Sequence, residues 1–494
     1  MSIICFKDVS FKYRQSGRFA LKSICFNINE GEFFAVMGET GAGKTTLLKL
    51  INGIIPHLCE GKLTGAVTVD GKNTIDYSVP ALAQKAGMVL DDPDAQLFTS
   101  TVRHEAAFGP ENLLLDPREI EDRVKSALRA AGLSGCEDRT PSTLSGGEKQ
   151  RLSIAAALAM RTKILCLDEP LCRLDPDGAQ EVISVLKNLK EKYKITIVMT
   201  SNDSKTVFEN ADRVCVLKNG SVAALETVKN IISGGVFLKE NGIQPLKTDT
   251  ICGIKPLNDY HAENSPRDAV KIKNFCFNYP NGISIENINL TIADNDFAAI
   301  IGNNGCGKTT LLKSITGLLR PRSGDIFIRG VNIKEKPVWE ISKEAGFVMQ
   351  NPDTQLFTDS VFNEAAFAFK NKSVFNLSGG EIKTRVDNAL TAAGLSDKAD
   401  VFPHALSRAD RAKTALACVL AMGCKIIILD EIDACLDYNE NIKIMDILCD
   451  LHSRGFTIIF VTHNMFLADN YARRIIKMSR NKIEEDKRLD KEFF

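Results

Sequence analysis

Two glycine-rich segments carry the residues best suited to holding a phosphate chain. Each has the pattern Gly-x4-Gly-Lys-Thr, in GETGAGKTT from residue 38 and in GNNGCGKTT from residue 302. Glycines let backbone amides face phosphate oxygens, and a helix that starts at the lysine directs its positive dipole end at the anion. The lysine reaches the β- and γ-phosphates, and the threonine hydroxyl ligates Mg²⁺. The predicted nucleotide-binding residues are Gly38, Gly41, Gly43, Lys44, Thr45, Thr46, Gly302, Gly305, Gly307, Lys308, Thr309 and Thr310.

An apolar run ends in Asp-Glu at two later places, Asp168-Glu169 and Asp430-Glu431. An aspartate at the end of a buried strand can hold hydrated Mg²⁺, and the following glutamate can orient or deprotonate an attacking water. The alternative is a helix cap after a buried strand. Downstream of a phosphate loop we predict the hydrolytic role. The predicted metal ligands include Thr45, Asp168, Thr309 and Asp430, and the predicted catalytic residues include Glu169 and Glu431.

These paired motifs belong to one duplicated sequence. PDAQLF begins at residue 93 and PDTQLF at residue 352, while VKSALRAAGL begins at residue 124 and VDNALTAAGL at residue 386. The order is kept and the spacing nearly so, which indicates a repeated domain. We therefore divide the chain into a first copy (residues 1–246), a linker (247–268) and a second copy (269–494).

The elements around these motifs predict an α/β architecture. Phe33–Met37, Ile164–Leu167 and Ile195–Met199 are apolar runs typical of buried parallel strands, and helical runs separate them. In the 494 residues, 62 basic and 62 acidic side chains cancel, so the net charge gives no sign of nucleic-acid binding. No run of about 18 apolar residues predicts a membrane span. The 14 cysteines form no C-x-x-C pair, which argues against a zinc ribbon.

The segment LSGGEKQR at residues 144–151, followed by a helical run and then Asp168-Glu169, resembles the ATP-binding-cassette (ABC) ATPases. The resemblance covers nearly the whole chain, twice. It implies two P-loop NTPase cassettes of α/β fold in one chain, each with a RecA-like core, a small antiparallel β subdomain and a helical subdomain. In that family two cassettes pair head to tail around two ATP molecules. By resemblance, Ser145, Gly146 and Gly147 contact the γ-phosphate held by the other cassette, and Tyr13 and Tyr279 stack on adenine.

A narrower resemblance is carried by Gln96-Leu-Phe98, by Gln355-Leu-Phe357 and by Phe108-Gly-Pro-Glu-Asn112. These segments are similar to those of the ATPases of energy-coupling-factor (ECF) importers, which take up vitamins and transition-metal ions. The resemblance implies a transmembrane T component, a substrate-binding S component and a peripheral location at the cytoplasmic face of the cell membrane. Core packing is the alternative role for the phenylalanines.

Two other functions stay open at this point, the ATPase of a sugar importer and a ribosome-associated tandem ABC protein. A ribosome-associated tandem ABC protein would have a long, charged, helical linker. The predicted linker, residues 247–268, is short and contains Cys, Gly and Pro, which argues against that function. The transported solute leaves no mark in the sequence, because a separate membrane protein selects it. We expect the two cassettes to pair within one chain, because the unbroken connection between the two copies favours their working as a pair. Pairing between chains is the alternative.

One segment of the second copy imitates the family signature. Ser378, in LSGGE, lies before the VDNALTAAGL helix, whereas Ser145 lies after the equivalent helix of the first copy. We therefore predict that Ser378 is a helix N-cap and that Glu381 completes a capping box. The second signature is then LSRAD at residues 406–410, which has lost both glycines.

The first copy departs from the family at two other positions. The family's glutamine is Gln350 in the second copy, a predicted metal ligand and catalytic residue, and its first-copy counterpart is Asp91. The family's histidine is His463, and a spacing of 262 residues makes Ser201 its counterpart. Head-to-tail pairing would bring Asp91, Ser201 and LSRAD to one ATP site. We therefore predict one impaired site and one competent site, the latter with His463.

Overall fold

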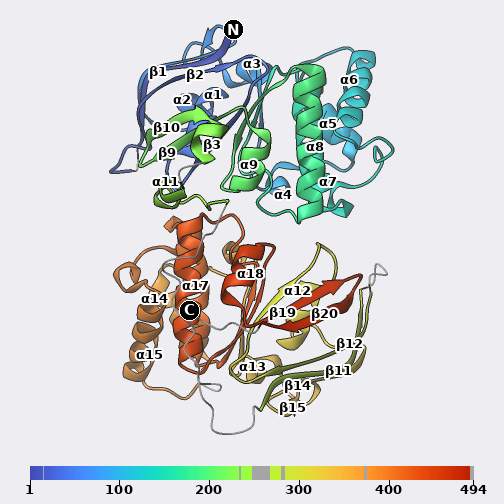
Figure 1. Cartoon of the computed structure of the whole chain (residues 1–494), viewed down its shortest axis with the longest axis vertical. Helices are drawn as coiled ribbons and strands as arrows, with labels where there is room; N and C mark the ends of the chain where they lie inside the picture. The colour runs from blue at the N-terminus through green and yellow to red at the C-terminus, as the bar shows by residue number, and fades with distance from the viewer. Residues whose placement is uncertain (15, 233–234, 247–266, 280–283, 372–374, 490–494) are drawn as a thin grey trace. The chain divides into compact units, whose positions relative to one another are not determined.

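The computed structural model divides into two compact units, one containing the first copy and the other the second (Figure 1). The structure describes residues 1–14, 16–232, 235–246, 267–279, 284–371 and 375–489. Most of the predicted linker, 247–266, lies outside the described residues, so the linker stays a prediction. Strand β11 (Asp268–Asn278) begins at Asp268, which is the last residue of the predicted linker.

A six-stranded sheet forms the centre of the first copy. Its strands are β3 (Phe33–Gly38), β6 (Ala86–Val89), β7 (Ile164–Leu167), β8 (Thr196–Thr200), β9 (Arg213–Lys218) and β10 (Ser221–Thr227). They lie in the order β10-β9-β3-β8-β7-β6, parallel except for β10. Every residue of β3, β7 and β8 is buried, as expected for parallel strands covered on both faces.

The second copy repeats this sheet. Its strands are β13 (Phe297–Ile301), β16 (Ala345–Val348), β17 (Ile426–Asp430), β18 (Thr457–Val461), β19 (Arg474–Ser479) and β20 (Lys482–Arg488). The order β16-β17-β18-β13-β19-β20 is that of the first copy, and β20 is again the antiparallel edge. The duplication inferred from the motifs therefore extends to sheet topology.

Each copy also has a smaller antiparallel sheet. In the first copy it consists of β1 (Ser2–Tyr13), β2 (Leu21–Asn29), β4 (Gly61–Val69) and β5 (Lys72–Asn73), in the order β2-β1-β4-β5. In the second copy it consists of β11, β12 (Ser284–Ala293), β14 (Ser323–Ile328) and β15 (Val331–Asn332), in the equivalent order. The apolar face of each small sheet joins the core that also buries the helix after the phosphate loop.

In each copy three helices pack on one another and form a helical lobe that adjoins the large sheet. Most of these helices are labelled in Figure 1. They are α5 (Val102–Asn112), α6 (Pro117–Ala130) and α7 (Gly146–Ala159), and α14 (Val361–Ala366), α15 (Gly379–Ala392) and α16 (Arg408–Met422). The apolar residues of α6 recur at helical spacing, at Val124, Ala127 and Leu128, and pack against Leu152 and Ala155 of α7. The two cassettes with core, antiparallel β and helical parts that the sequence predicted are thus confirmed.

The remaining helices connect these layers. The longer ones are α1 (Lys44–Ile51), α8 (Pro176–Tyr193), α9 (Ser204–Asn210), α12 (Lys308–Ile315), α17 (Tyr438–Ser453) and α18 (Met465–Tyr471). The shorter ones are α2 (Ile54–His57), α3 (Val79–Ala83), α4 (Pro93–Gln96), α10 (Val228–Ile232), α11 (Gly235–Glu240) and α13 (Val338–Ile341).

Candidate functional site

Each glycine-rich loop leaves a buried strand and opens a helix. β3 leads through Gly38 to Lys44, the first residue of α1, and β13 leads through Gly302 to Lys308, the first residue of α12. Gly38 has a φ of 139°, and a Cβ there would lie 2.2 Å from the Leu217 carbonyl oxygen. Only glycine fits this position, since both conformation and space exclude a side chain. The loop amides and the helix start together suit an anion.

The two loop lysines are held inside their loops. Lys44 is 8% exposed and Lys308 is 4% exposed. The Nζ of Lys44 donates to the Gly38 carbonyl oxygen at 2.7 Å, and the Nζ of Lys308 donates to the Gly302 carbonyl oxygen at 2.7 Å. A buried ammonium group needs such partners. Both cations therefore lie where phosphate oxygens can bind them.

The glutamates after β7 and β17 face these lysines. Glu169 Oε1 lies 3.5 Å from the Nζ of Lys44, and Glu431 Oε1 lies 4.0 Å from the Nζ of Lys308. Both glutamates have left-handed backbone conformations, with φ of 43° and 47°. This conformation is strained for a residue with a Cβ, and such strain clusters at functional sites. Each copy therefore aims one carboxylate at its own phosphate loop.

Burial raises the pKa of the aspartate that precedes each glutamate. The pKa of Asp430 rises to about 6, because desolvation outweighs the hydrogen bond from the Thr309 hydroxyl. Burial also raises the pKa of Asp168, against hydrogen bonds from the hydroxyls of Thr45 and Thr200. Each aspartate thus lies beside the threonine of its own loop, as the predicted metal-ligand sets require.

Four predicted residues meet in the second copy. The Nε2 of Gln350 donates to Glu431 Oε2 at 2.6 Å. The Nε2 of His463 lies 3.1 Å from Glu431 Oε1, 3.5 Å from the Nζ of Lys308 and 3.0 Å from Asn304 Oδ1. Glu431 is 7% exposed, so these polar groups supply its partners in a nearly dry setting. The second copy has brought together the carboxylate, the imidazole, the amide and the ammonium group.

The first-copy residue that matches His463 is Asn202, so the expectation of Ser201 is wrong. The N–H of Ser201 donates to β3 as the N–H of Thr462 donates to β13, which pairs these two residues. Their hydroxyls also make the same turn, accepting from the N–H two residues later at 3.1 and 2.9 Å. The following residue, Asn202, then takes the histidine's place, and its Oδ1 lies 3.3 Å from the Nζ of Lys44.

The physical reason for this correction is a difference in chain length. From the glutamate to the end of the next parallel strand, the first copy has one residue more than the second. A constant spacing of 262 therefore fails beyond that point. The first copy still lacks an imidazole here, but an amide rather than a hydroxyl reaches the lysine.

Asp91 occupies the glutamine position of the first copy, as predicted. Gln96 accepts from the N–H just before Asp91 at 2.9 Å, and Gln355 accepts from the N–H just before Gln350 at 3.1 Å. These equivalent contacts show that Asp91 and Gln350 occupy matching positions in the two copies. After burial and the hydroxyl hydrogen bonds, the charge of Asp91 is a further cause that raises the pKa of Asp168. The first copy thus replaces a neutral amide with a carboxylate.

Three serines begin helices in the helical lobes. Ser145 caps α7 and Ser407 caps α16, the equivalent helices that precede β7 and β17. Ser378 caps α15, and its N–H donates to Glu381 at 2.8 Å to complete a capping box. The predicted cap role of Ser378 is therefore confirmed. Glycines follow Ser145, whereas Arg408 follows Ser407, so the second signature helix opens with a large cationic side chain.

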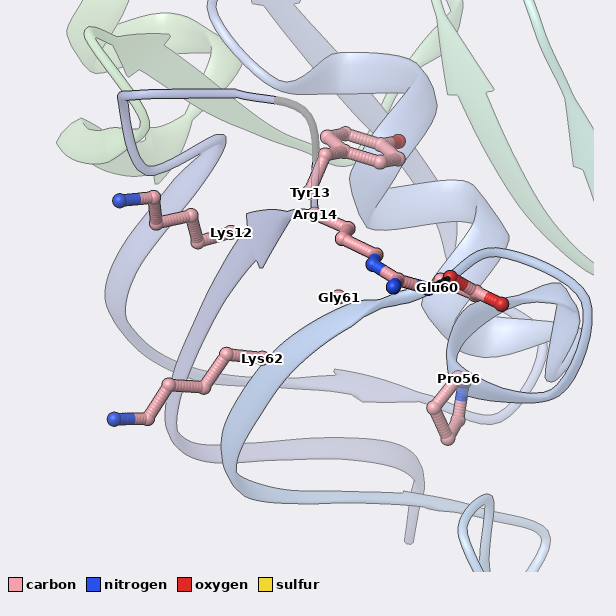
Figure 2. A pocket seen from close by; sticks show the side chains of 7 residues that line it. All are labelled: Lys12, Tyr13, Arg14, Pro56, Glu60, Gly61 and Lys62. Atoms are coloured by element: carbon pink, nitrogen blue, oxygen red, sulfur yellow. Dashed lines mark hydrogen bonds and ion pairs between the residues drawn. The ribbon is translucent and has the colours of Figure 1, made fainter.

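Tyr13, the last residue of β1, and Tyr279, the residue after β11, lie against their phosphate-loop helices. The hydroxyls of Tyr13 and Tyr279 lie 3.0 and 3.1 Å from the Oγ1 of Thr46 and Thr310. Figure 2 shows the open pocket beside the first tyrosine, lined by Lys12, Tyr13, Arg14, Pro56, Glu60, Gly61 and Lys62. An ion pair between Arg14 and Glu60 borders it. The ring thus stands at a pocket next to the phosphate loop, and its stacking on adenine stays a prediction.

The role of Thr200, the last residue of β8, was not predicted from the sequence. Its Oγ1 donates to Asp168 Oδ1 at 2.7 Å and accepts from the N–H of Glu169 at 2.8 Å. The second copy has Val461 here, and among the described residues Asp430 Oδ1 is buried without a hydrogen-bond partner. The difference between threonine and valine at matched strand ends was the available signal. The second copy thus presents an unpaired carboxylate oxygen.

A family model described as ABC transporter matches the chain twice, at residues 21–172 and 285–434. These ranges include both phosphate loops and both Asp-Glu pairs. The chain belongs to the ABC transporter family. It is a tandem ABC ATPase, with one ATP-binding cassette in each copy. Among the helices that the structure describes, none combines the length and the apolar character that crossing a bilayer requires.

Relatives extend this similarity to nearly the whole chain. An ABC transporter ATP-binding protein of Caldanaerobacter subterraneus subsp. tengcongensis is 34% identical over 97% of this chain and 90% of its own. One of Methanosarcina mazei is 35% identical over 97% of this chain and 94% of its own. Among solved structures, cbiO1 of Clostridium perfringens, part of the ABC transporter complex cbiONQ, is 34% identical with a TM-score of 0.44. That match covers 48% of this chain and 94% of cbiO1.

Proposed function

We propose that this tandem ABC ATPase is the motor of an ECF-type importer that takes up a vitamin or a transition-metal ion. In this proposal it lies at the cytoplasmic face of the cell membrane, held there by a transmembrane T component that works with a substrate-binding S component. The observation that carries the proposal is a pair of exposed phenylalanines that occurs at the same place in both copies.

The aromatic pairs have the same geometry. Phe98 and Phe108 meet edge to face with ring centroids 4.8 Å apart, and Phe357 and Phe367 do so at 4.6 Å. Phe98 is 67% exposed and Phe357 is 62% exposed. Core packing would have buried these rings, so that alternative does not describe them. Repeated exposed aromatic side chains favour a protein partner.

A buried glutamate fixes each pair. Glu105 and Glu364 are each 5% exposed. One carboxylate oxygen of Glu105 accepts from the N–H groups of Phe98 and the next residue at 3.1 and 2.9 Å. Glu364 does the same for Phe357 at 2.9 and 2.7 Å. These hydrogen bonds hold the backbone of each loop that carries an exposed phenylalanine. Because the loops are already ordered, less conformational entropy is lost when a partner binds.

Mg²⁺ fits the oxygen donors of the second copy. Hard divalent cations prefer carboxylate, hydroxyl and amide oxygens, and Thr309, Gln350 and Asp430 supply all three. The unpaired, buried Oδ1 of Asp430 is the feature that a cation would satisfy. When bound, Mg²⁺ supplies positive charge that offsets the charge on the phosphate oxygens. Thr45 and Asp168 are the matching donors of the first copy.

The second copy has the groups that ATP hydrolysis needs. Glu431 can accept a proton from water as the water oxygen bonds to the γ-phosphorus and the bond to the β-phosphate oxygen breaks, leaving ADP and phosphate. Gln350 holds this carboxylate by their 2.6 Å hydrogen bond. His463 and Lys308 lie close enough to the same carboxylate to bind γ-phosphate oxygens beside it.

The family's head-to-tail pairing is extended to this chain as part of the proposal. It would complete the nucleotide of the second copy with Ser145, Gly146 and Gly147, and that of the first copy with LSRAD. The first nucleotide would then meet Asp91, Asn202 and a signature without glycines. The proposal therefore assigns most turnover to the second copy.

The test is copurification with membrane components after double substitution of Phe98→Ala and Phe357→Ala. We expect loss of the membrane partners with ATP binding intact, since both rings are largely exposed and neither belongs to a phosphate loop. The control is Phe19→Ala with Trp339→Ala, two aromatics that are each 45% exposed, one in each copy. Unchanged recovery of membrane partners by the phenylalanine variant, or sedimentation of the protein with ribosomes, would contradict the proposal.

A further inference from the structure

One carboxylate of the second copy has no place in the hydrolytic set described above. Asp433 follows Glu431 by two residues and is half-buried. Its Oδ2 accepts a hydrogen bond from the Oγ1 of Thr462 at 2.6 Å. Thr462 is the residue directly before His463, so this bond joins the loop that carries the glutamate to the loop that carries the histidine.

The threonine hydroxyl makes a second bond on the other side of the histidine. The Oγ1 of Thr462 accepts from the N–H of Asn464 at 2.9 Å, while it donates to Asp433. These two bonds use the hydrogen and a lone pair of the hydroxyl, and so fix its rotamer. They enclose the peptide units on both sides of His463, whose Nε2 lies 3.1 Å from Glu431.

We propose that Asp433 is a positioning residue for hydrolysis, which acts through Thr462 to hold His463 against Glu431. The bond has a carboxylate acceptor and is short, and bonds to carboxylates are stronger than neutral ones. It ties the histidine loop directly to the backbone that bears the glutamate. The two groups that must meet the same γ-phosphate are thereby set at one separation before ATP arrives.

The first copy is an internal comparison. Its residue matching Asp433 is Leu171, which has no acceptor, while Ser201 still makes the local turn by accepting from Asp203 at 3.1 Å. Asn202 stands in place of the histidine there. The turn itself therefore forms without a carboxylate. The added bond occurs in the copy that has an imidazole to position.

The electrostatic setting makes the ionised carboxylate of Asp433 costly for folding. Burial raises the pKa of Asp433 to about 6, against the hydrogen bond from Thr462, and the charge of Glu431 raises it further while His463 lowers it. Two carboxylates separated by two residues repel each other, so a leucine as in the first copy would be the less costly choice for folding.

The test measures kcat and KM for ATP in the full-length protein. Asp433→Leu, which copies the first cassette, should lower kcat by about tenfold, as expected for one lost hydrogen bond to a charged group. KM for ATP should stay within about twofold. Asp433→Asn should retain most of kcat, because its carbonyl oxygen can accept the same bond. Thr462→Val breaks the bond from the other side and should match Asp433→Leu, and the double variant should lose no more than either single one.

The control is Leu171→Val in the first cassette, which should leave kcat and KM unchanged. In a His463→Ala background, Asp433→Leu should not lower the residual single-turnover rate further. Three outcomes would overturn the proposal: equal losses for Asp433→Asn and Asp433→Leu, additive losses for Asp433→Leu and Thr462→Val, or a change in KM alone. Thr462→Val keeps the test valid if Asp433→Leu fails to fold.

Discussion

At the residue scale, the aspartate of the proposed metal-ligand set has different hydrogen-bond partners in the two cassettes. In the first, Thr200 donates to Asp168, whereas in the second Val461 leaves Asp430 Oδ1 without a partner. A buried carboxylate oxygen without a hydrogen-bond partner opposes folding until a ligand satisfies it. Without a ligand, the unpaired Oδ1 of Asp430 therefore lowers the unfolding free energy of the second cassette. The same oxygen is free to bind a cation.

The burial of Asp430 predicts that the unfolding free energy of the nucleotide-free protein depends on pH. Burial raises the pKa of Asp430 to about 6, so the folded state binds this proton more tightly than the unfolded chain. The nucleotide-free protein should then lose stability as pH rises from about 4 through 6, by at most about 3 kcal/mol from this group. Asp430→Asn stays neutral and should raise the unfolding free energy near pH 7.5, with a smaller gain near pH 5.

Urea unfolding without nucleotide at both pH values measures the effect. Asp168→Asn is the matched control and should gain less, because Thr200 already satisfies that carboxylate. A gain for Asp430→Asn that is the same at both pH values would show that ionisation is not the cause. The variant should also lose the stabilisation that Mg²⁺ and ATP together give the parent protein.

Residue identities were predictable where a motif is local. The phosphate loops need only a short pattern, and the capping box at Ser378 needs only three residues beyond it. Asn202 and Thr200 were not predictable in this way, since their roles depend on strand register across a segment of unequal length. The contact between Asp433 and Thr462 joins two loops 29 residues apart, and no local pattern reports it.

At the element scale, the proposed pairing makes the helix starts decide which serine would face a nucleotide. Ser378 begins α15, which is equivalent to α6, whereas Ser145 begins α7. Ser378→Arg should therefore leave ATP turnover near that of the parent and cost about 1 kcal/mol of stability through the lost cap. Ser145→Arg should abolish turnover, because its side chain would occupy the place of the γ-phosphate in the proposed pairing.

Steady-state ATPase rates and thermal unfolding of the two variants separate these effects. Loss of turnover in Ser378→Arg at unchanged stability would mean that LSGGE of the second copy is a signature after all. The elements themselves followed well from sequence, because duplicated strands such as β7 and β17 have continuous apolar runs. The ends of the strands were predicted less accurately. The strand expected at Ile195–Met199 is β8, which begins and ends one residue later.

At the scale of the whole molecule, one chain contains two cassettes whose proposed catalytic sets differ. The second cassette has Gln350, His463 and the hydrogen bond between Asp433 and Thr462. The first cassette has Asp91 in place of the glutamine and Asn202 in place of the histidine. Both retain the buried lysine and the strained glutamate. Nucleotide binding should thus be a property of both cassettes, and rapid hydrolysis a property of the second alone.

The two glutamates provide the decisive comparison, since both have the same conformation and face the same kind of lysine. Glu431→Gln keeps the shape but removes the base, and should lower turnover by about 10²- to 10⁴-fold. Glu169→Gln makes the identical change where no imidazole is present, and should cost far less. Steady-state ATPase rates of the full chain, with bound nucleotide counted in each variant, measure the difference. Equal losses would show that Asp91 and Asn202 do not impair the first cassette, because an amide in place of the histidine would then support the same chemistry.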